Sequence, residues 1–432
     1  SISKGLPYVN INNNIIKEDN SIKIINYQLL HNFPTQTDIS QGYDTFCVGA
    51  FVSGIIPPIK QTSIVHGSEN LIAPCGHLAC SLFTSIQPEL LNVYIKKNED
   101  IHSELSNLVA NMCFPLGIKP CYECSLDENN NKINNLQNPQ ETFYNVIQNE
   151  KGEIYYVTTM QYFIKMNTQE FIYKYNFNPM NYYLQLLSNE KNINNKDNKI
   201  KGNIQLLGKI INNNIVFIPE SISLVSKYPS FIPMSKCLRC LISLQNDDMN
   251  SFISHLINEV PFPKKETQIQ FYIPKIKTPI ILNHEFNLFL MVNENVNIDT
   301  SLSISQINSK IILQKISVDN IIMIFQLILL EQKILFLENN YQILSEILYI
   351  FSTLIYPLTW INPFIPVLSL KTVRFLQSPV PYIMGLDEYL LKYADESDNI
   401  FLGNEMIIFN IMKDYFVSAS SRKPMHNKDL LH

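Results

Sequence analysis

The chain of 432 residues is long for one compact core, and ordinary domain sizes predict two or three domains. A hydrophobic fraction of 46% and a charged fraction of 16% exclude wholesale disorder. The formal net charge of -5 gives no broad positive field for phosphates, so we expect protein partners and no nucleic acid.

Residues 1–40 are polar and rich in asparagine, and we expect a loosely ordered arm. The opening residues do not resemble a secretory signal, so we expect a cytoplasmic location. The most apolar runs, 321–330 and 347–355, are shorter than the roughly 18 residues that indicate a membrane span. We expect no transmembrane segment, and we expect any contact with vesicle or endosomal membranes to be peripheral and made through partners.

The first half of the chain predicts one sheet with a helix across it. Aromatic and β-branched residues indicate strands, and apolar residues three and four apart indicate helices. Residues 176–214 contain few apolar side chains that could be buried, and we expect them to form a solvated insertion. In chain order, we expect a strand at 43–55, a helix at 101–114, strands at 142–148, 154–166 and 215–226, and a helix carrying 234–242.

The second half changes character after two short strand-like runs at 267–273 and 279–292. A helix, a short apolar strand and a second helix follow in that order, which argues for a sheet covered by helices. The overall fold class is therefore α/β. The expected elements are a helix at 317–331, a strand at 333–338, a helix at 341–356, a strand at 364–369 and a turn into another strand at 378–386.

Motifs for covalent or nucleotide chemistry are absent from the sequence. Neither GxGxxG nor GxxxxGK[ST] occurs, and the 12 glycines are too few for a hidden relative of either. HExxH and GxSxG are also absent. Glu331 and Glu346 flank apolar helices, where charges more often solvate an element than catalyse. We expect no cofactor and no enzyme of covalent catalysis.

Two CxxC pairs, Cys121/Cys124 and Cys237/Cys240, raise the alternative of a zinc site. They lie more than a hundred residues apart, whereas structural zinc sites usually join pairs within about 15 to 20 residues. We therefore expect core and loop thiols and no metal.

Several stretches closely resemble, in order and spacing, the motifs of the DENN domain family. Within 319–385, "LLEQKILFLENN", "LIYPLTWINPFIPVLS" and "FLQSPVPYIMGL" are similar to its central motifs, and "NMCFPLGI" and "FIPESISLVSKYPSF" are similar to upstream ones. The residues that carry these motifs are Phe114, Pro115, Gly117, Tyr228, Pro229, Glu331, Tyr356, Pro357, Trp360, Pro366, Pro379, Pro381 and Gly385.

The resemblance implies an N-terminal longin-like module and a central α/β DENN module with a sheet between helices. The expected boundaries are the arm at 1–40, the longin-like module at 41–250, the central module at 265–395 and the truncated start of a downstream module at 400–432. Ser369 stands where the family usually has a proline, which puts the identity of a partner in doubt more than the fold.

The function that the resemblance implies is guanine nucleotide exchange on a Rab-family small GTPase in membrane trafficking. A Rab-binding or longin-dimer scaffold without exchange activity remains an alternative. A GTPase-activating subunit would need a mobile arginine, and Arg239, the only arginine of the longin-like module, is expected on a helix.

We expect GTPase contacts where loops at strand ends gather between the two modules. The only tryptophan, Trp360, is expected instead to be buried at the corner where Pro357 ends the preceding helix and Pro366 begins the next strand. The candidate contact residues are Tyr43 and Lys119 on the longin-like side, and Lys333, Glu338, Asn339, Asn340 and Asn362 on the central side.

Overall fold

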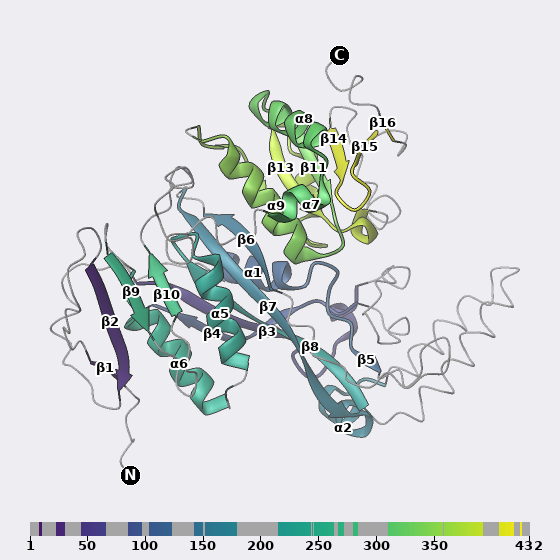
Figure 1. The fold of residues 1–432 in the computed structure, drawn as a ribbon. Coiled ribbons are helices and arrows are strands. Elements are labelled where there is room, and N and C mark those ends of the chain that lie inside the picture. The colour runs from purple at the N-terminus through teal and green to yellow at the C-terminus, as the bar shows by residue number, and fades with distance from the viewer. Residues whose placement is uncertain are drawn as a thin grey trace, which may run out of the picture.

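The computed structural model contains two large β-sheets, each with its own helices, and a smaller sheet beside the first (Figure 1). We call the body around the first large sheet the N-terminal module and the body around the second the central module. The residues that the structure describes are 8–10, 23–30, 45–65, 85–96, 103–122, 142–149, 152–178, 215–242, 244, 246–262, 267–271, 280–283, 310–356, 358–391, 406–418 and 424–425.

The N-terminal module is an antiparallel sheet of strand order β4-β3-β8-β7-β6. Helices cover both of its faces, which explains why β3 is buried along its whole length rather than on alternate residues. Phe51 of β3 packs on the face with α1 and α2, and its neighbour Val52 packs on the face with α5 and α6. The bounds are β3 Gly49–Gly54, β4 Glu89–Ile95, α1 Ser103–Cys113, β5 Cys121–Tyr122, β6 Thr142–Gln148, β7 Ile154–Asn167, α2 Thr168–Tyr175, β8 Ile215–Ser226, α5 Phe231–Ile242 and α6 Asn246–Asn258.

The central module is a sheet of order β12-β13-β11-β14-β15-β16 in which β12, β13, β11 and β14 are parallel. One face packs against α7, α8 and α9, and the other against η4 and the segment after β13. The expected sheet between helices is therefore found. The bounds are α7 Lys310–Lys315, α8 Val318–Leu329, β11 Lys333–Leu337, α9 Tyr341–Leu354, β12 Phe364–Ile365, η4 Val373–Gln377, β13 Tyr382–Leu386, β14 Met406–Asn410, β15 Tyr415–Ser418 and β16 Pro424–Met425.

The arm predicted to be loosely ordered contains two strands, so that prediction was wrong for part of its length. β1 (Tyr8–Asn10) pairs with β2 (Lys23–Leu30), and β2 pairs in parallel with β9 (Thr267–Phe271), which pairs with β10 (Ile280–Asn283). The partner strand lies more than 230 positions away in sequence, so no local pattern revealed the pairing. The predicted insertion lies largely outside the described residues.

The segment around Trp360 differs from the expectation of a fully buried corner. The indole is only partly buried against the core under α8 and α9, and its Nε1 donates to the carbonyl of Pro363 at 3.4 Å. Its neighbours Leu358 and Ile361 are 61% and 81% exposed, because the chain leaves the core surface after α9. Pro366 follows β12 rather than opening it, and Pro357 lies outside the described residues.

We therefore predict that Trp360→Ala lowers the free energy of unfolding by only about 1 kcal/mol. Phe351→Ala should cost about 3 to 5 kcal/mol, because Phe351 is fully buried in the same core and its loss leaves a cavity. Urea denaturation of both variants beside the wild type measures the difference. Equal losses in the two variants would show that Trp360 is a core residue after all.

Candidate functional site

The two modules meet along strand β6 and helix α9, a contact that we call the seam (Figure 1). β6 is the outermost strand of its sheet, so one row of its backbone groups has no neighbouring strand to bond. The amide of Tyr144 donates instead to Oγ of Ser345 on α9 at 3.1 Å. The side-chain oxygen of Asn145 accepts the amide of Val367 at 3.0 Å, so each module satisfies polar groups of the other.

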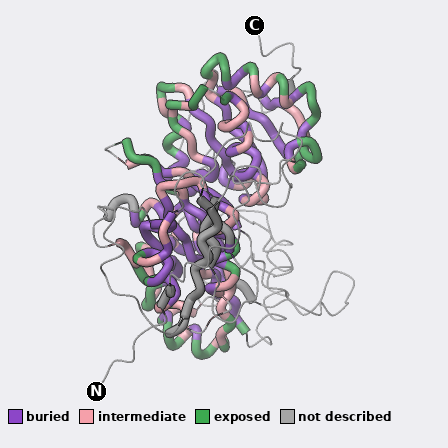
Figure 2. Tube along the Cα trace, turned by 60° about the vertical axis from the view of Figure 1, so that its left-hand side comes forward, coloured by how far each residue is buried: buried purple, intermediate pink, exposed green. Residues whose placement is uncertain are grey.

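Aromatic side chains make the apolar part of the seam. Phe143 of β6 packs edge to face on Tyr341 of α9, with ring centroids 5.5 Å apart. Tyr349, two turns further along α9, meets Phe231 of α5 at 4.8 Å. Each module therefore places a buried side chain inside the core of the other, and in Figure 2 buried residues lie inside both modules.

A second line of contact runs through the segment Phe114 to Gly117. The amide of Leu370 donates to the carbonyl of Pro115 at 2.9 Å, and Leu116 packs in the core of the central module. Gly117 has a φ of 76°, and a Cβ there would lie 2.9 Å from Cβ of Ser85. This backbone path therefore requires glycine, which gives the FP-x-G motif its physical reason.

Gly385 of β13 has a similar role inside the central module. A Cβ at this position would lie 2.0 Å from the carbonyl oxygen of Pro366 and 2.9 Å from Cγ of Leu344. The absence of a side chain lets the segment after β12 and helix α9 close onto the strand. The motif residues Pro366 and Gly385 thus fix how α9 sits, and α9 in turn forms the seam.

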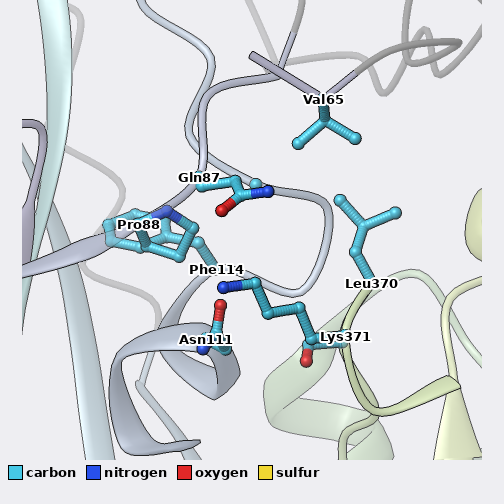
Figure 3. A pocket seen from close by; sticks show the side chains of 9 residues that line it. Val65, Gln87, Pro88, Asn111, Phe114, Leu370 and Lys371 are labelled. Atoms are coloured by element: carbon cyan, nitrogen blue, oxygen red, sulfur yellow. The ribbon is translucent and has the colours of Figure 1, made fainter. Parts of the chain in front are cut away.

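A pocket of about 120 Å³ opens beside the second line of contact (Figure 3). Figure 3 shows the side chain of Lys371 extending from the central module towards Asn111 and Gln87 of the N-terminal module. Val65, Pro88, Phe114 and Leu370 supply apolar side chains to the rest of its wall, beside the polar Ser369. The lining residues are Val65, Gln87, Pro88, Asn111, Phe114 and Gly117 of the N-terminal module, and Ser369, Leu370 and Lys371 of the central module.

The candidate contact residues do not form one surface. Lys333 begins β11 and Glu338 follows its end, so the two lie about 17 Å apart on opposite edges of the parallel sheet. Asn362 precedes β12 and lies at the Lys333 edge. Lys119 is buried, with 8% of its surface exposed, and Tyr43 lies outside the described residues.

Glu338, Asn339 and Asn340 hold the turn from β11 into α9. Oε1 of Glu338 accepts the amides of Asn339 at 2.9 Å and Asn340 at 3.1 Å, and only 4% of the residue is exposed. The side chain of Asn340 accepts the amide of Ile343 and caps α9. Oε1 of Glu338 and the side-chain oxygen of Asn340 are therefore engaged in structure, as is that of Asn339, which accepts the amide of Glu388.

Asp387 lies at the same edge, directly after β13. Burial raises the pKa of its carboxyl to about 6, although the amide of Tyr389 donates to it at 2.8 Å and opposes the shift. The sequence pattern did not single it out. Its burial depends on contacts with parts of the chain that are distant in sequence, and a local sequence pattern cannot show such contacts.

The seam residues Asn145 and Ser345 were also missed, as was Lys371 in the pocket wall. An asparagine or serine in an apolar strand or helix is ordinary, and only the pairing of residues about 200 positions apart gives these side chains their role. One signal lay close by: Ser369, where the family usually has proline, adjoins Leu370 and Lys371 in the pocket wall.

Neither the CxxC helix nor any other described cluster has metal-site geometry. Cys237 is buried, and Cys240 is partly buried on α5, where burial raises the pKa of both thiols. Within the described ranges, no group of three His, Cys, Asp or Glu side chains could hold a metal ion. Cys124 lies outside those ranges. A search of the described helices found none with the length and apolar character needed to cross a membrane.

The fold and the seam define a two-module α/β protein, and comparison with known proteins shows which family part of the chain resembles. Residues 217–406 match the DENN (AEX-3) domain. The match begins in β8 of the N-terminal module and ends at β14 of the central module. This part of the chain, less than half of its length, is similar to a DENN domain.

Curated relatives agree with this assignment. The chain is 27% identical over 180 residues to the DENN domain and WD repeat-containing protein SCD1 of Arabidopsis thaliana, covering 39% of this chain and 14% of that protein. It is 25% identical over 215 residues to the DENN domain-containing protein C297.05 of Schizosaccharomyces pombe, covering 44% and 20%. The elicitor of plant defense protein 1 of Verticillium dahliae is 29% identical over 119 residues, covering 27% and 10%. The chain thus spans a fifth or less of the length of each of these relatives.

We predict that Asn145→Ala lowers the free energy of unfolding by about 1 to 3 kcal/mol, because it leaves the buried amide of Val367 without an acceptor. Asn258→Ala is the matched control, since its side chain makes only exposed bonds to Ser254 on α6. It should cost less than about 0.5 kcal/mol. Urea denaturation measures both variants, and an Asn145→Ala loss no larger than the control would show that the seam bond does not stabilise the fold.

Proposed function

We propose that the protein is a guanine nucleotide exchange factor for a Rab-family small GTPase, acting in membrane trafficking. The DENN domain over residues 217–406 is the observation that carries the proposal, because exchange on Rab GTPases is what this family is known for. The upstream motif at Phe114 to Gly117, which builds part of the seam, supports it. We further propose that the N-terminal module is longin-like, with the domain boundaries given above.

Exchange needs no covalent step, only differential binding. A protein that binds the nucleotide-free GTPase more tightly than the GDP form must weaken GDP binding by the same factor. A surface built from two modules suits this task if the modules keep one arrangement, because little binding free energy is then spent on ordering them. The buried hydrogen bonds and aromatic contacts of the seam provide such an arrangement.

Arg239 gives little support to a GTPase-activating role. It lies in the last turn of α5, as the sequence predicted, rather than in a loop that could reach a phosphate. A Rab-binding scaffold differs from an exchange factor only in that it binds the GTPase without accelerating the release of GDP. Recruitment to vesicle or endosomal membranes through partners belongs to the same proposal.

We predict that the purified chain accelerates the release of fluorescent GDP from at least one Rab of its own cell. If the whole of an ordinary coupling between two binding sites appears in the dissociation rate of GDP, the increase is about 5- to 150-fold. Release is followed by stopped-flow fluorescence in the presence of excess unlabelled nucleotide, with a heat-unfolded sample of the chain as control.

Stable binding to one Rab without faster release from any of them would contradict the proposal and favour the scaffold. Faster GTP hydrolysis that is lost in Arg239→Ala would favour an activating subunit instead.

A further inference from the structure

Lys371 stands at a fixed place in the wall of the seam pocket. Its neighbour Leu370 is bonded to Pro115 of the N-terminal module at 2.9 Å. On either side, the amide of Ser369 donates to Oγ1 of Thr372 at 2.7 Å, and both residues are buried. A proline at position 369 has no N–H and could not make this bond. The lysine therefore extends from an ordered turn.

The charge of Lys371 has no ion-pair partner among the residues that the structure describes. Lys371 is exposed. Figure 3 shows its amino group near the side chain of Asn111, with the amide group of Gln87 on the same side of the pocket. An ammonium group beside two neutral amides attracts an anionic group that can also accept hydrogen bonds.

The rest of the pocket is apolar and small. Val65, Pro88, Phe114 and Leu370 form an apolar wall around a volume of about 120 Å³. Since one water occupies about 30 Å³ in the liquid, this volume equals roughly four waters, or one side chain of medium size. Apolar walls that end in a cation and amides suit an aliphatic stem with a carboxylate at its tip.

We propose that the seam pocket receives an acidic side chain, Asp or Glu, of the small GTPase, with Lys371 as its ion-pair partner. This inference rests on the proposed function and names one contact of it. Because the walls come from both modules, the carboxylate is bound only when the modules hold their present arrangement. The contact thereby ties recognition of the GTPase to the closed seam.

Three variants test the assignment. Lys371→Met keeps the stem and removes the charge, and Lys371→Glu reverses it. Arg374→Glu is the matched control, because Arg374 is an exposed cation three positions further on that does not line the pocket. GDP release from a responsive Rab gives kcat/KM, and biolayer interferometry gives the affinity for the nucleotide-free Rab. Thermal unfolding of each variant monitors folding.

We expect Lys371→Met to lower kcat/KM about tenfold, Lys371→Glu to lower it further, and Arg374→Glu to change it less than about threefold. The effect of Lys371→Met should shrink at high salt, because screening already weakens the pair in the wild type. Among Asp and Glu to Lys changes scanned over the Rab, one should restore activity with Lys371→Glu and with no other variant.

Equal losses of kcat/KM in Lys371→Glu and Arg374→Glu would indicate a general electrostatic attraction between the two proteins. That result would overturn the pocket assignment. Full activity in Lys371→Glu, or no rescuing substitution on the Rab, would overturn it as well. These results leave the proposed function standing, since the wild type still releases GDP. A wild-type chain that neither binds nor unloads any Rab would reject both.

Discussion

The structure depends on how the open edge of β6 is covered. An edge strand that presents free amides and carbonyls is a hazard in water and a cost when buried. Here the covering element is α9, whose Ser345 accepts a strand amide, while Asn145 of the strand accepts an amide from the segment after β12. Each of these hydrogen bonds therefore joins a group of one module to a group of the other.

Much of the family's sequence pattern follows from this constraint. Gly385 allows Pro366 and Leu344 to approach β13, which sets the position of α9, and Gly117 allows the chain to pass close to Ser85. The same geometry leaves a small pocket where the modules part, with Lys371 at its wall. A fixed relation between modules is what a regulator of another protein needs when it acts by differential binding rather than by chemistry.

The sequence predicted many of the elements because their signals are local, although β4, α2 and α6 were not among them. Branched and aromatic runs marked β3, β7 and β8, and helical spacing marked α1 and α5. Predictions failed where the structure of a segment depends on residues that are far away in the sequence. The strand β2 pairs with β9, which is distant in sequence. Leu358 and Ile361 are exposed because no other described segment packs over them.

The candidate contact residues show the same limit. Loop position and polarity singled out Glu338 and Asn340, yet both are used to hold the turn before α9. Lys333 and Glu338 are close in sequence, but the parallel strand places them at opposite edges. Lys371 had no distinguishing pattern, because the role proposed for it depends on the Asn111 and Gln87 side chains of the other module, which line the same pocket.

The central claim is that a small GTPase docks across both modules while the seam stays closed. Hydrogen exchange of the chain, alone and with a nucleotide-free Rab, tests it most directly. The account predicts new protection on both sides of the pocket, in 85–96 and 103–118 of the N-terminal module and in 364–377 of the central module, with no loss of protection in β6 or α9. Protection confined to one module, or faster exchange in β6 and α9 on binding, would contradict it.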